Sequence, residues 1–167
     1  MKSVEIIQSR QNSLIKERVK LQQKKYRQKT GCFLIEGIRL VEEAVSAGSL
    51  TEVFVEEALF NSERGERLFR RIEKSTIACY QVSTDILRVL TETESPQGIV
   101  GVIRQAKVDL NRINLKQGLI LILDGVQDPG NLGTIWRTAW AAGVDALFCL
   151  PGTVDPYNGK TIRASMG

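Results

Sequence analysis

The feature that most constrains the fold is a regular alternation of short apolar runs and amphipathic segments between residues 32 and 104. The apolar runs are short and rich in β-branched residues, which is typical of strands, whereas the segments between them repeat apolar residues at helical spacing. Alternation of this kind predicts an α/β domain with a parallel or mixed sheet covered by helices. Four strands, at 32–37, 51–57, 75–82 and 95–105, enclose three helices, at 38–48, 62–74 and 83–90.

A second α/β unit is predicted from residue 118 onward. The run LILILDG (119–125) is apolar on both faces, as in a central parallel strand. A helix is expected at about 131–142, and DALFCLP (145–151) is the expected neighbouring strand. The domain boundaries that follow are 32–106 for the first α/β domain, 107–117 for a polar linker and 118–167 for the second unit.

The positive charge of the chain is concentrated at its N-terminus. The net charge is +4, yet residues 1–29 alone hold nine Lys and Arg against two Glu. We expect residues 1–31 to form a basic arm that neutralises phosphates, with Tyr26 as a stacking ring. A solvated helix face is the alternative. The basic candidates for RNA contact are Lys16, Arg18, Lys20, Lys24, Lys25 and Arg27.

The residue inventory excludes several kinds of chemistry. The chain contains no histidine, so Ser-His-Asp, Cys-His and H-E-x-x-H sites are excluded. The three cysteines are far apart in sequence and are expected to be reduced core residues, and no metal site is predicted. No apolar run approaches the roughly 20 residues of a membrane-spanning helix, and the first residues lack the apolar segment of a signal peptide. A cytoplasmic location is the expectation.

The turn DGVQDPGNLGTIWRTAW (124–140) carries the strongest candidate site. At 100° per residue, Leu132, Trp136 and Ala139 share the face that packs on the sheet, and Arg137 falls just beside it, at the edge of the core. The glycines fit neither G-x-G-x-x-G nor a P-loop. A strand end, a turn and a helix N-terminus can still form an anion-binding crevice, although the turn residues can equally serve only to shape the turn and cap the helix.

The same stretch resembles the first signature of the SpoU/TrmH family of RNA 2′-O-ribose methyltransferases, within the SPOUT superfamily. The signature N-x-G-x-x-x-R is present as Asn131, Gly133 and Arg137. DPYNGKTIRASMG (155–167) is similar to the stretch that follows in the family, and FLIEGIRLVEEAV (33–45) is similar to the start of its N-terminal substrate-binding domain. The resemblance thus extends from about Cys32 to Gly167.

The resemblance implies a small α/β RNA-binding domain, followed by the first part of an α/β-knot methyltransferase domain. It also implies a homodimer that uses S-adenosylmethionine as the methyl donor and structured ribosomal or transfer RNA as the substrate. Arg137 would be the catalytic arginine, and Asn131 would hold the active-site loop or the substrate. Glu36 and Arg39 match the N-terminal motif and are candidates for RNA contact, as are Arg163 and Ser165 near the C-terminus.

The family's second and third motifs, which form the knot and most of the cofactor pocket, are not found in these 167 residues. We therefore expect the cofactor-binding residues to lie beyond Gly167, and this chain to be inactive in methyl transfer by itself. The second unit is expected to be unstable alone or to be stabilised by a partner chain, because it has only two clear strands and an exposed sheet edge.

The sequence is compatible with two other functions. In the first, the chain would be a non-catalytic RNA-binding module derived from such an enzyme. In the second, it would be a small-molecule α/β enzyme that uses Asp124 and Asp128 as acid or base. The absence of histidine and of a nucleotide-binding loop disfavours the second of these. A cofactor pocket would distinguish a methyltransferase from the binding module.

Overall fold

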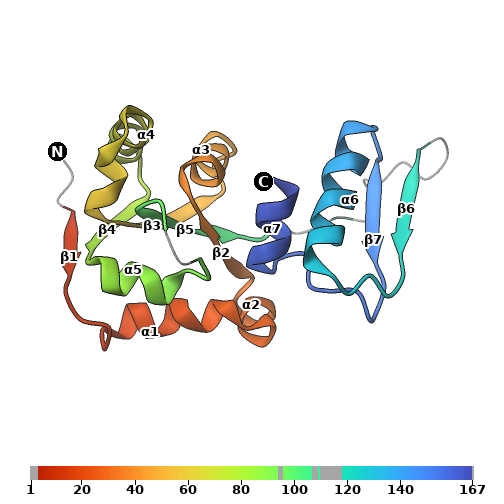
Figure 1. Ribbon diagram of the computed structural model, residues 1–167, viewed down its shortest axis with the longest axis horizontal. Helices are drawn as coiled ribbons and strands as arrows, with labels where there is room; N and C mark the ends of the chain where they lie inside the picture. Colours follow the sequence, from red (N-terminus) through yellow and green to blue (C-terminus); the bar gives the residue numbers. More distant parts are fainter. Residues whose placement is uncertain (1–3, 94–95, 107–108, 110–117, 167) are drawn as a thin grey trace. The chain divides into compact units, whose positions relative to one another are not determined.

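The computed structural model describes residues 4–93, 96–106, 109 and 118–166, and these fall into two compact units, Met1–Gln105 and Ala106–Gly167 (Figure 1). The α/β units expected at 32–106 and 118–167 fall one in each of these units, and the first unit also includes the N-terminal residues expected to form an arm. The linker expected at 107–117 lies, apart from Asp109, outside the described residues. Within the described part of the chain the longest helix has 13 residues, and no helix qualifies as a candidate membrane span.

The first unit is built on a mixed five-stranded sheet in the order β1-β4-β3-β5-β2. β1 and β4 are parallel, β3 and β4 are parallel, and β5 runs antiparallel to both β3 and β2. The predicted mixed sheet is therefore confirmed. The strands are β1 (Glu5–Ile7), β2 (Cys32–Glu36), β3 (Leu50–Val55), β4 (Ala78–Val82) and β5 (Ile99–Arg104).

Helices cover both faces of this sheet, with α1, α2 and α5 on one side and α3 and α4 on the other (Figure 1). Several of them begin at a side-chain cap: Asn12, Ser62 and Ser83 accept hydrogen bonds from backbone N–H groups of the first turn. The helical segments are α1 (Ser13–Val19), η1 (Lys20–Gln22), α2 (Lys24–Thr30), α3 (Ile38–Ser46), η2 (Glu57–Asn61), α4 (Glu63–Glu73) and α5 (Thr84–Leu90).

The N-terminal segment differs from the expected arm. Residues 5–30 form β1, α1, η1 and α2 and belong to the same compact unit as the rest of the sheet. Ile7, Ile15 and Leu21 are each at most 3% exposed and share a core cluster with Phe54 and Leu87. The physical reason is amphipathicity: the lysines occupy the outer surface, while a few apolar residues at helical spacing face the sheet.

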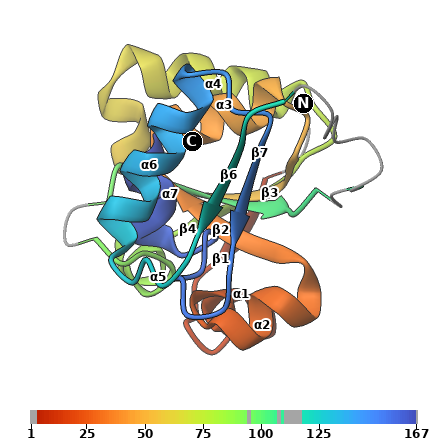
Figure 2. The ribbon, with the colours of Figure 1, turned by 90° about the vertical axis from the view of Figure 1, so that its right-hand side faces the viewer.

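The second unit contains two parallel strands, β6 (Ile120–Leu123) and β7 (Ala146–Cys149), with α6 (Pro129–Ala141) between them in sequence and α7 (Gly159–Ser165) after them. The expected strand neighbours are thus confirmed. α6 begins two residues earlier than expected, because Asp128 caps it and Pro129 occupies its first position. Figure 2 looks onto the side of β6 and β7 away from α6. Ile122 of β6 is 61% exposed.

Candidate functional site

The signature residues lie where α6 packs against α7. Gly133 is buried, and a Cβ added there would stand 2.5 Å from the Ala164 Cβ and 2.6 Å from the Thr161 carbonyl oxygen. Only glycine permits this approach of the two helices, because any side chain would overlap the α7 backbone. Gly133 therefore sets the distance between α6, which carries Arg137, and the end of α7.

Arg137 follows Gly133 by one helical turn and lies on the exposed surface of α6. The expectation that its guanidinium sits at the edge of the core is not met, because Arg137 is exposed although Ala139, two residues further along α6, is buried. Its Nη1 is 3.1 Å from the Sδ of Met166, just beyond α7. The guanidinium thus has a weak partner and keeps other N–H groups directed to its surroundings, so it is available to an anionic ligand.

Asn131 occupies the first turn of α6 and is exposed. Its backbone N–H donates to Oδ1 of Asp128 at 2.7 Å, which is the capping interaction of the helix. The carboxylate that caps the helix is therefore Asp128, and the cap does not require the side chain of Asn131. This leaves the amide of Asn131 available for a role in the loop or toward a ligand.

The loops that follow β6 and β7 lie side by side, because Val154 N–H donates to the Val126 carbonyl at 2.9 Å. Burial raises the pKa of the Tyr157 phenol, and the nearby Asp155 carboxylate raises it further. The pKa of the Cys149 thiol is raised by the same two causes. Both groups are therefore protonated near neutral pH and are unsuited to act as a base or a nucleophile.

The other C-terminal candidates, Arg163 and Ser165, lie on α7 and are half-buried. The hydroxyl of Ser165 donates to the Ile162 carbonyl at 2.8 Å. Packing of α7 on α6 brings this end of α7 next to the turn that holds Gly133, whose added Cβ would be 2.8 Å from the Ser165 backbone nitrogen. The structure thus brings Arg137 and the end of α7 together. Among the described residues, no group of three or more His, Cys, Asp or Glu side chains is placed to hold a metal.

Among the basic residues predicted to contact RNA in the N-terminal segment, the structure exposes Lys16, Lys24 and Lys25. Lys20 is half-buried, and its Nζ is 5.5 Å from the centre of the Tyr26 ring and pairs with Glu17. These side chains belong to α1, η1 and α2, which are continuous along one side of the sheet (Figure 1). They form a basic surface suited to phosphate contact.

Arg18 and Arg27 are placed differently from these lysines. Arg27 is 4% exposed and donates from Nη1 to the carbonyls of Leu21 and Gln22 at 2.8 and 2.7 Å. An RNA contact by Arg27 is therefore contradicted by its burial, and its role is to hold the turn between η1 and α2. Arg18 forms a bidentate ion pair with Glu52 on β3.

Glu36 and Arg39 flank the start of α3. Glu36 is half-buried at the end of β2, and the Thr93 hydroxyl donates to its carboxylate, which is consistent with a role in the fold. Arg39 is exposed on α3. Because α3 covers the opposite side of the sheet from α1 and α2, the structure does not bring Arg39 together with the lysines (Figure 1).

Sequence reasoning missed two residues that the fold brings into view. Arg104 ends β5 and is the register partner of Cys32, so it is carried to the same edge as α2. Only the antiparallel pairing of β2 and β5 reveals this placement. Trp140 on α6 is 81% exposed, which is unusual for such a large apolar ring, and its position on the outer face of α6 follows from the helical period.

Both units match known protein families. Residues 12–101 match the MRM3-like substrate binding domain, and residues 118–167 match the SpoU rRNA Methylase family. The chain therefore belongs to the RNA-methyltransferase class defined by these two domains. More particularly, it is a member of the SpoU rRNA methylase family with an MRM3-like substrate binding domain.

Curated relatives of the chain are RNA methyltransferases. The chain is 43% identical over 162 residues to the 23S rRNA (guanosine(2553)-2′-O)-methyltransferase RlmP of Bacillus subtilis, covering 96% of the chain and 60% of the relative. It is 32% identical to the human mitochondrial rRNA methyltransferase 3, covering 85% of the chain and 34% of that protein. The chain thus spans about 60% of the length of the first of these relatives.

Solved structures show the same arrangement of elements. An AdoMet-bound rRNA methyltransferase from Sinorhizobium meliloti is 31% identical with a TM-score of 0.81, over 98% of this chain and 61% of that one. The SpoU methyltransferase AviRb from Streptomyces viridochromogenes, in complex with AdoMet, is 28% identical with a TM-score of 0.78, over 94% of this chain and 60% of that one. The predicted fold class, a small α/β domain followed by part of a SpoU methyltransferase domain, is confirmed.

Proposed function

We propose that this chain is part of an S-adenosylmethionine-dependent methyltransferase that modifies the 2′-hydroxyl of a ribose in ribosomal RNA. The observation that carries the proposal is the placement of Arg137 on an exposed helix surface, in the N-x-G-x-x-x-R signature, with Gly133 fixing its distance from α7. The similarity to RlmP over 96% of the chain supports the substrate class. The exposed lysines of α1 and α2 supply phosphate contacts for the same RNA.

The chemistry requires a ribose hydroxyl to lose its proton as its oxygen attacks a methyl group. The chain has no histidine to accept that proton, and the phenol of Tyr157 is held protonated. Arginine is not a base, because its pKa is far above neutrality. The Arg137 guanidinium instead holds the neighbouring phosphate and stabilises the alkoxide as it develops, so that the proton can pass to solvent water without a strong base.

S-adenosylmethionine supplies the methyl group, and the second unit fits this cationic donor in part. Ligands of α/β folds bind at the carboxyl ends of parallel strands, where the loops after β6 and β7 adjoin here. Asp124 and Asp155 place carboxylates on these two loops, which suits the positive charge of a sulfonium. These residues would contribute one side of a donor site.

A homodimer and a cytoplasmic location belong to the same proposal. The face of β6 and β7 that carries Ile122, together with exposed Trp140 on α6, provides apolar surface that suits a partner. Bacterial ribosomal RNA, the substrate named for RlmP, suits the cytoplasm. Sedimentation of the protein over a range of concentrations would test the dimer.

The experiment that tests the function is methyl transfer from S-adenosylmethionine with a labelled methyl group to 23S ribosomal RNA transcribed in vitro. A 2′-O-methyl group protects the adjacent phosphodiester from alkali, so the label should be recovered in alkali-resistant dinucleotides. The protein at the full length of its relatives is compared with its Arg137→Ala and Arg137→Lys variants. We expect Arg137→Ala to lower the rate about 100- to 1,000-fold, and Arg137→Lys to restore it only in part. Full activity of Arg137→Lys would contradict a role in which the guanidinium holds the phosphate through two hydrogen bonds.

The alternative function, a non-catalytic RNA-binding module, is favoured by one observation: the basic surface of α1 and α2 lies wholly within the first unit. The protein at the full length of its relatives separates the two functions. Titration calorimetry with S-adenosylmethionine and with ribosomal RNA should show RNA binding in either case, whereas stoichiometric binding of S-adenosylmethionine is expected only of the methyltransferase.

A further inference from the structure

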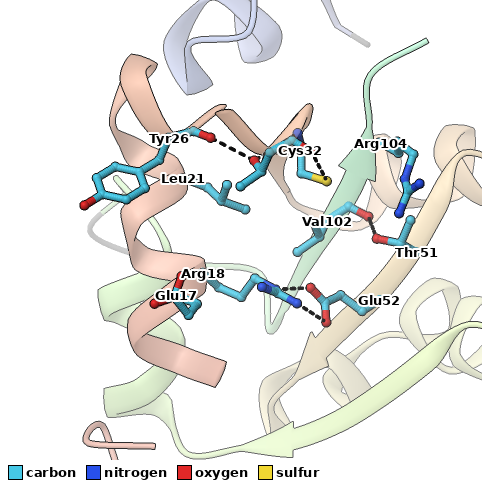
Figure 3. Close-up of a pocket in the computed structure, with 10 residues that line it drawn as sticks. Glu17, Arg18, Leu21, Tyr26, Cys32, Thr51, Glu52, Val102 and Arg104 are labelled. Atoms are coloured by element: carbon cyan, nitrogen blue, oxygen red, sulfur yellow. Dashed lines mark hydrogen bonds and ion pairs between the residues drawn. The ribbon is translucent and has the colours of Figure 1, made fainter. Parts of the chain in front are cut away.

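A pocket of about 210 Å³ lies in the first unit between the α1–η1–α2 segment and strands β2, β3 and β5 (Figure 3). Leu21 and Val102 give it an apolar wall, and both are buried. Arg18, Arg104, Glu52 and Glu17 supply charged groups around it, and the Glu17 carboxylate is paired with Lys20. The volume is below the roughly 300–1,000 Å³ of sites for drug-sized ligands, so the pocket suits one flat ring system.

The Arg18 guanidinium is held in a fixed plane at this pocket. Its Nε and Nη2 both donate to the carboxylate of Glu52, the second at 3.2 Å. The side chain of Glu52 is 9% exposed and that of Arg18 is 30% exposed, so Glu52 is covered while part of the Arg18 side chain stays open where it lines the pocket. Two parallel hydrogen bonds orient the plane, and an oriented guanidinium plane is a surface on which nucleobases stack.

The surroundings of the pocket suit the remainder of a nucleotide. Arg104 is exposed and lies beside Thr51, and the Thr51 hydroxyl is engaged with the Val102 carbonyl at 2.9 Å (Figure 3). A phosphate attached to a base in the pocket would find the charge of Arg104 close by. Arg18 of α1 and Tyr26 of α2 line the pocket, and the same two helices carry the exposed Lys16, Lys24 and Lys25, whose charge attracts an RNA backbone.

We propose that this pocket binds one unpaired nucleotide of the RNA substrate, with its base against the Arg18 guanidinium and its phosphate near Arg104. The proposal rests on the proposed RNA substrate and adds how a single-stranded position is recognised. An ion pair that only joined α1 to β3 would need no accessible guanidinium face. Here the pair lines a hollow, with apolar residues on the side where a ring would pack.

The test combines a protein variant with an RNA variant. The 167-residue chain is titrated with hairpin-loop fragments of 23S ribosomal RNA, and the fragment that binds most tightly is remade with each loop base in turn replaced by an abasic ribose. We expect one abasic position to weaken binding about tenfold. Arg18→Lys, which keeps the charge but lacks the plane, should also weaken it about tenfold, and the two changes together should weaken it no further.

The salt dependence of binding separates stacking from charge. Arg18→Lys should leave the slope of log affinity against log salt unchanged, whereas Arg104→Gln should lower that slope by about one. Arg70→Lys, on the exposed surface of α4 across the sheet, is the matched control and should alter neither quantity. Thermal unfolding checks that each variant is folded. Arg104→Gln changes an exposed position, so its effect on RNA binding is measured with the ion pair between Arg18 and Glu52 intact.

The outcomes are distinct. Normal RNA binding by Arg18→Lys, or additive effects of the protein and RNA changes at every loop position, would overturn the nucleotide pocket and leave the proposed function standing. If no fragment bound the unaltered chain, the RNA-binding proposal itself would fail, and this inference with it.

Discussion

Gly133 is the residue on which the packing of the second unit depends most directly. Replacement by alanine places a methyl group 2.5 to 2.8 Å from atoms of α7, so the helices must move apart. Overpacking of this kind costs about 1–3 kcal/mol of the free energy of unfolding. Trp136 and Trp140, the two tryptophans of the chain, both lie on α6, so their fluorescence reports denaturation of the second unit.

The control for Gly133→Ala is Thr134→Ala, at the neighbouring exposed position of α6, which should change the free energy of unfolding by no more than about 0.5 kcal/mol. Equal denaturation midpoints for the two variants would contradict the close packing of α6 on α7. The signature from which Gly133 was identified does not reveal this packing role. The role becomes visible only when α7, about thirty residues later, folds against the helix.

Arg27 should stabilise the turn between η1 and α2 and make no contribution to RNA binding. Arg27→Met removes the donor to the Leu21 and Gln22 carbonyls, and each buried carbonyl left without a partner costs about 1–3 kcal/mol. We expect a loss of stability of that order in far-UV circular dichroism, with the salt slope of RNA binding unchanged below the transition. Lys25→Met, at an exposed position of α2, should show the opposite pattern: normal stability and a lower slope.

A stable Arg27→Met variant with weakened, less salt-dependent RNA binding would restore Arg27 as a phosphate contact. The sequence does not show whether Arg27 contacts a phosphate or holds the turn, because Arg27 carries the same charge as the neighbouring lysines. The difference arises in the fold, where the turn after η1 directs two carbonyls at the Arg27 guanidinium.

Among the elements, α3 and α4 are joined by a charged contact whose strength depends on pH. The Arg64 guanidinium donates to the Glu42 carboxylate from Nε at 2.9 Å and lowers the pKa of Glu42 below its ordinary value of 4.5. A lowered pKa in the folded state contributes stability above about pH 4.5 that is lost as the pH falls through the folded value. Glu42→Gln should therefore destabilise the first unit more at pH 7 than at pH 3.

This prediction is checked by urea unfolding at the two pH values, monitored by circular dichroism. Glu43→Gln, an exposed neighbour on α3, is the matched control and should show a smaller change with pH. Equal destabilisation by Glu42→Gln at both pH values would show that the contact between α3 and α4 does not depend on the ionised carboxylate.

The order of elements between 32 and 104 could be predicted from the sequence, because each strand and helix there has a clear period and a turn or cap at its boundary. β1, with three residues, is too short to show a period. The sequence predicts a basic arm where the structure has α1 and α2, because the lysines there outnumber the few apolar residues that reach the core. The strand order could not be predicted, since pairing of β1 with β4 and of β2 with β5 depends on contacts distant in sequence.

At the scale of the whole molecule, the N-x-G-x-x-x-R signature predicted the family, and both matched domains confirm it. The roles of Asn131, Arg163 and Ser165 stay predictions, because a ligand is needed to show which groups they contact. The pocket at Arg18 had no signature in the sequence. It is assembled from the α1–η1–α2 segment and from β2, β3 and β5, and its lining residues lie far apart in sequence, from Glu17 to Arg104.

We propose that this protein methylates a ribose of ribosomal RNA through Arg137. The most direct measurement is mass spectrometry of 2′-O-methylated nucleosides in ribosomal RNA from cells that produce either the unaltered protein or its Arg137→Ala variant at equal levels. Arg137 is exposed, so the variant should fold. We expect one 2′-O-methylated nucleoside to disappear with Arg137→Ala and to be present with the unaltered protein. An identical set of methylated nucleosides in both cells would contradict it.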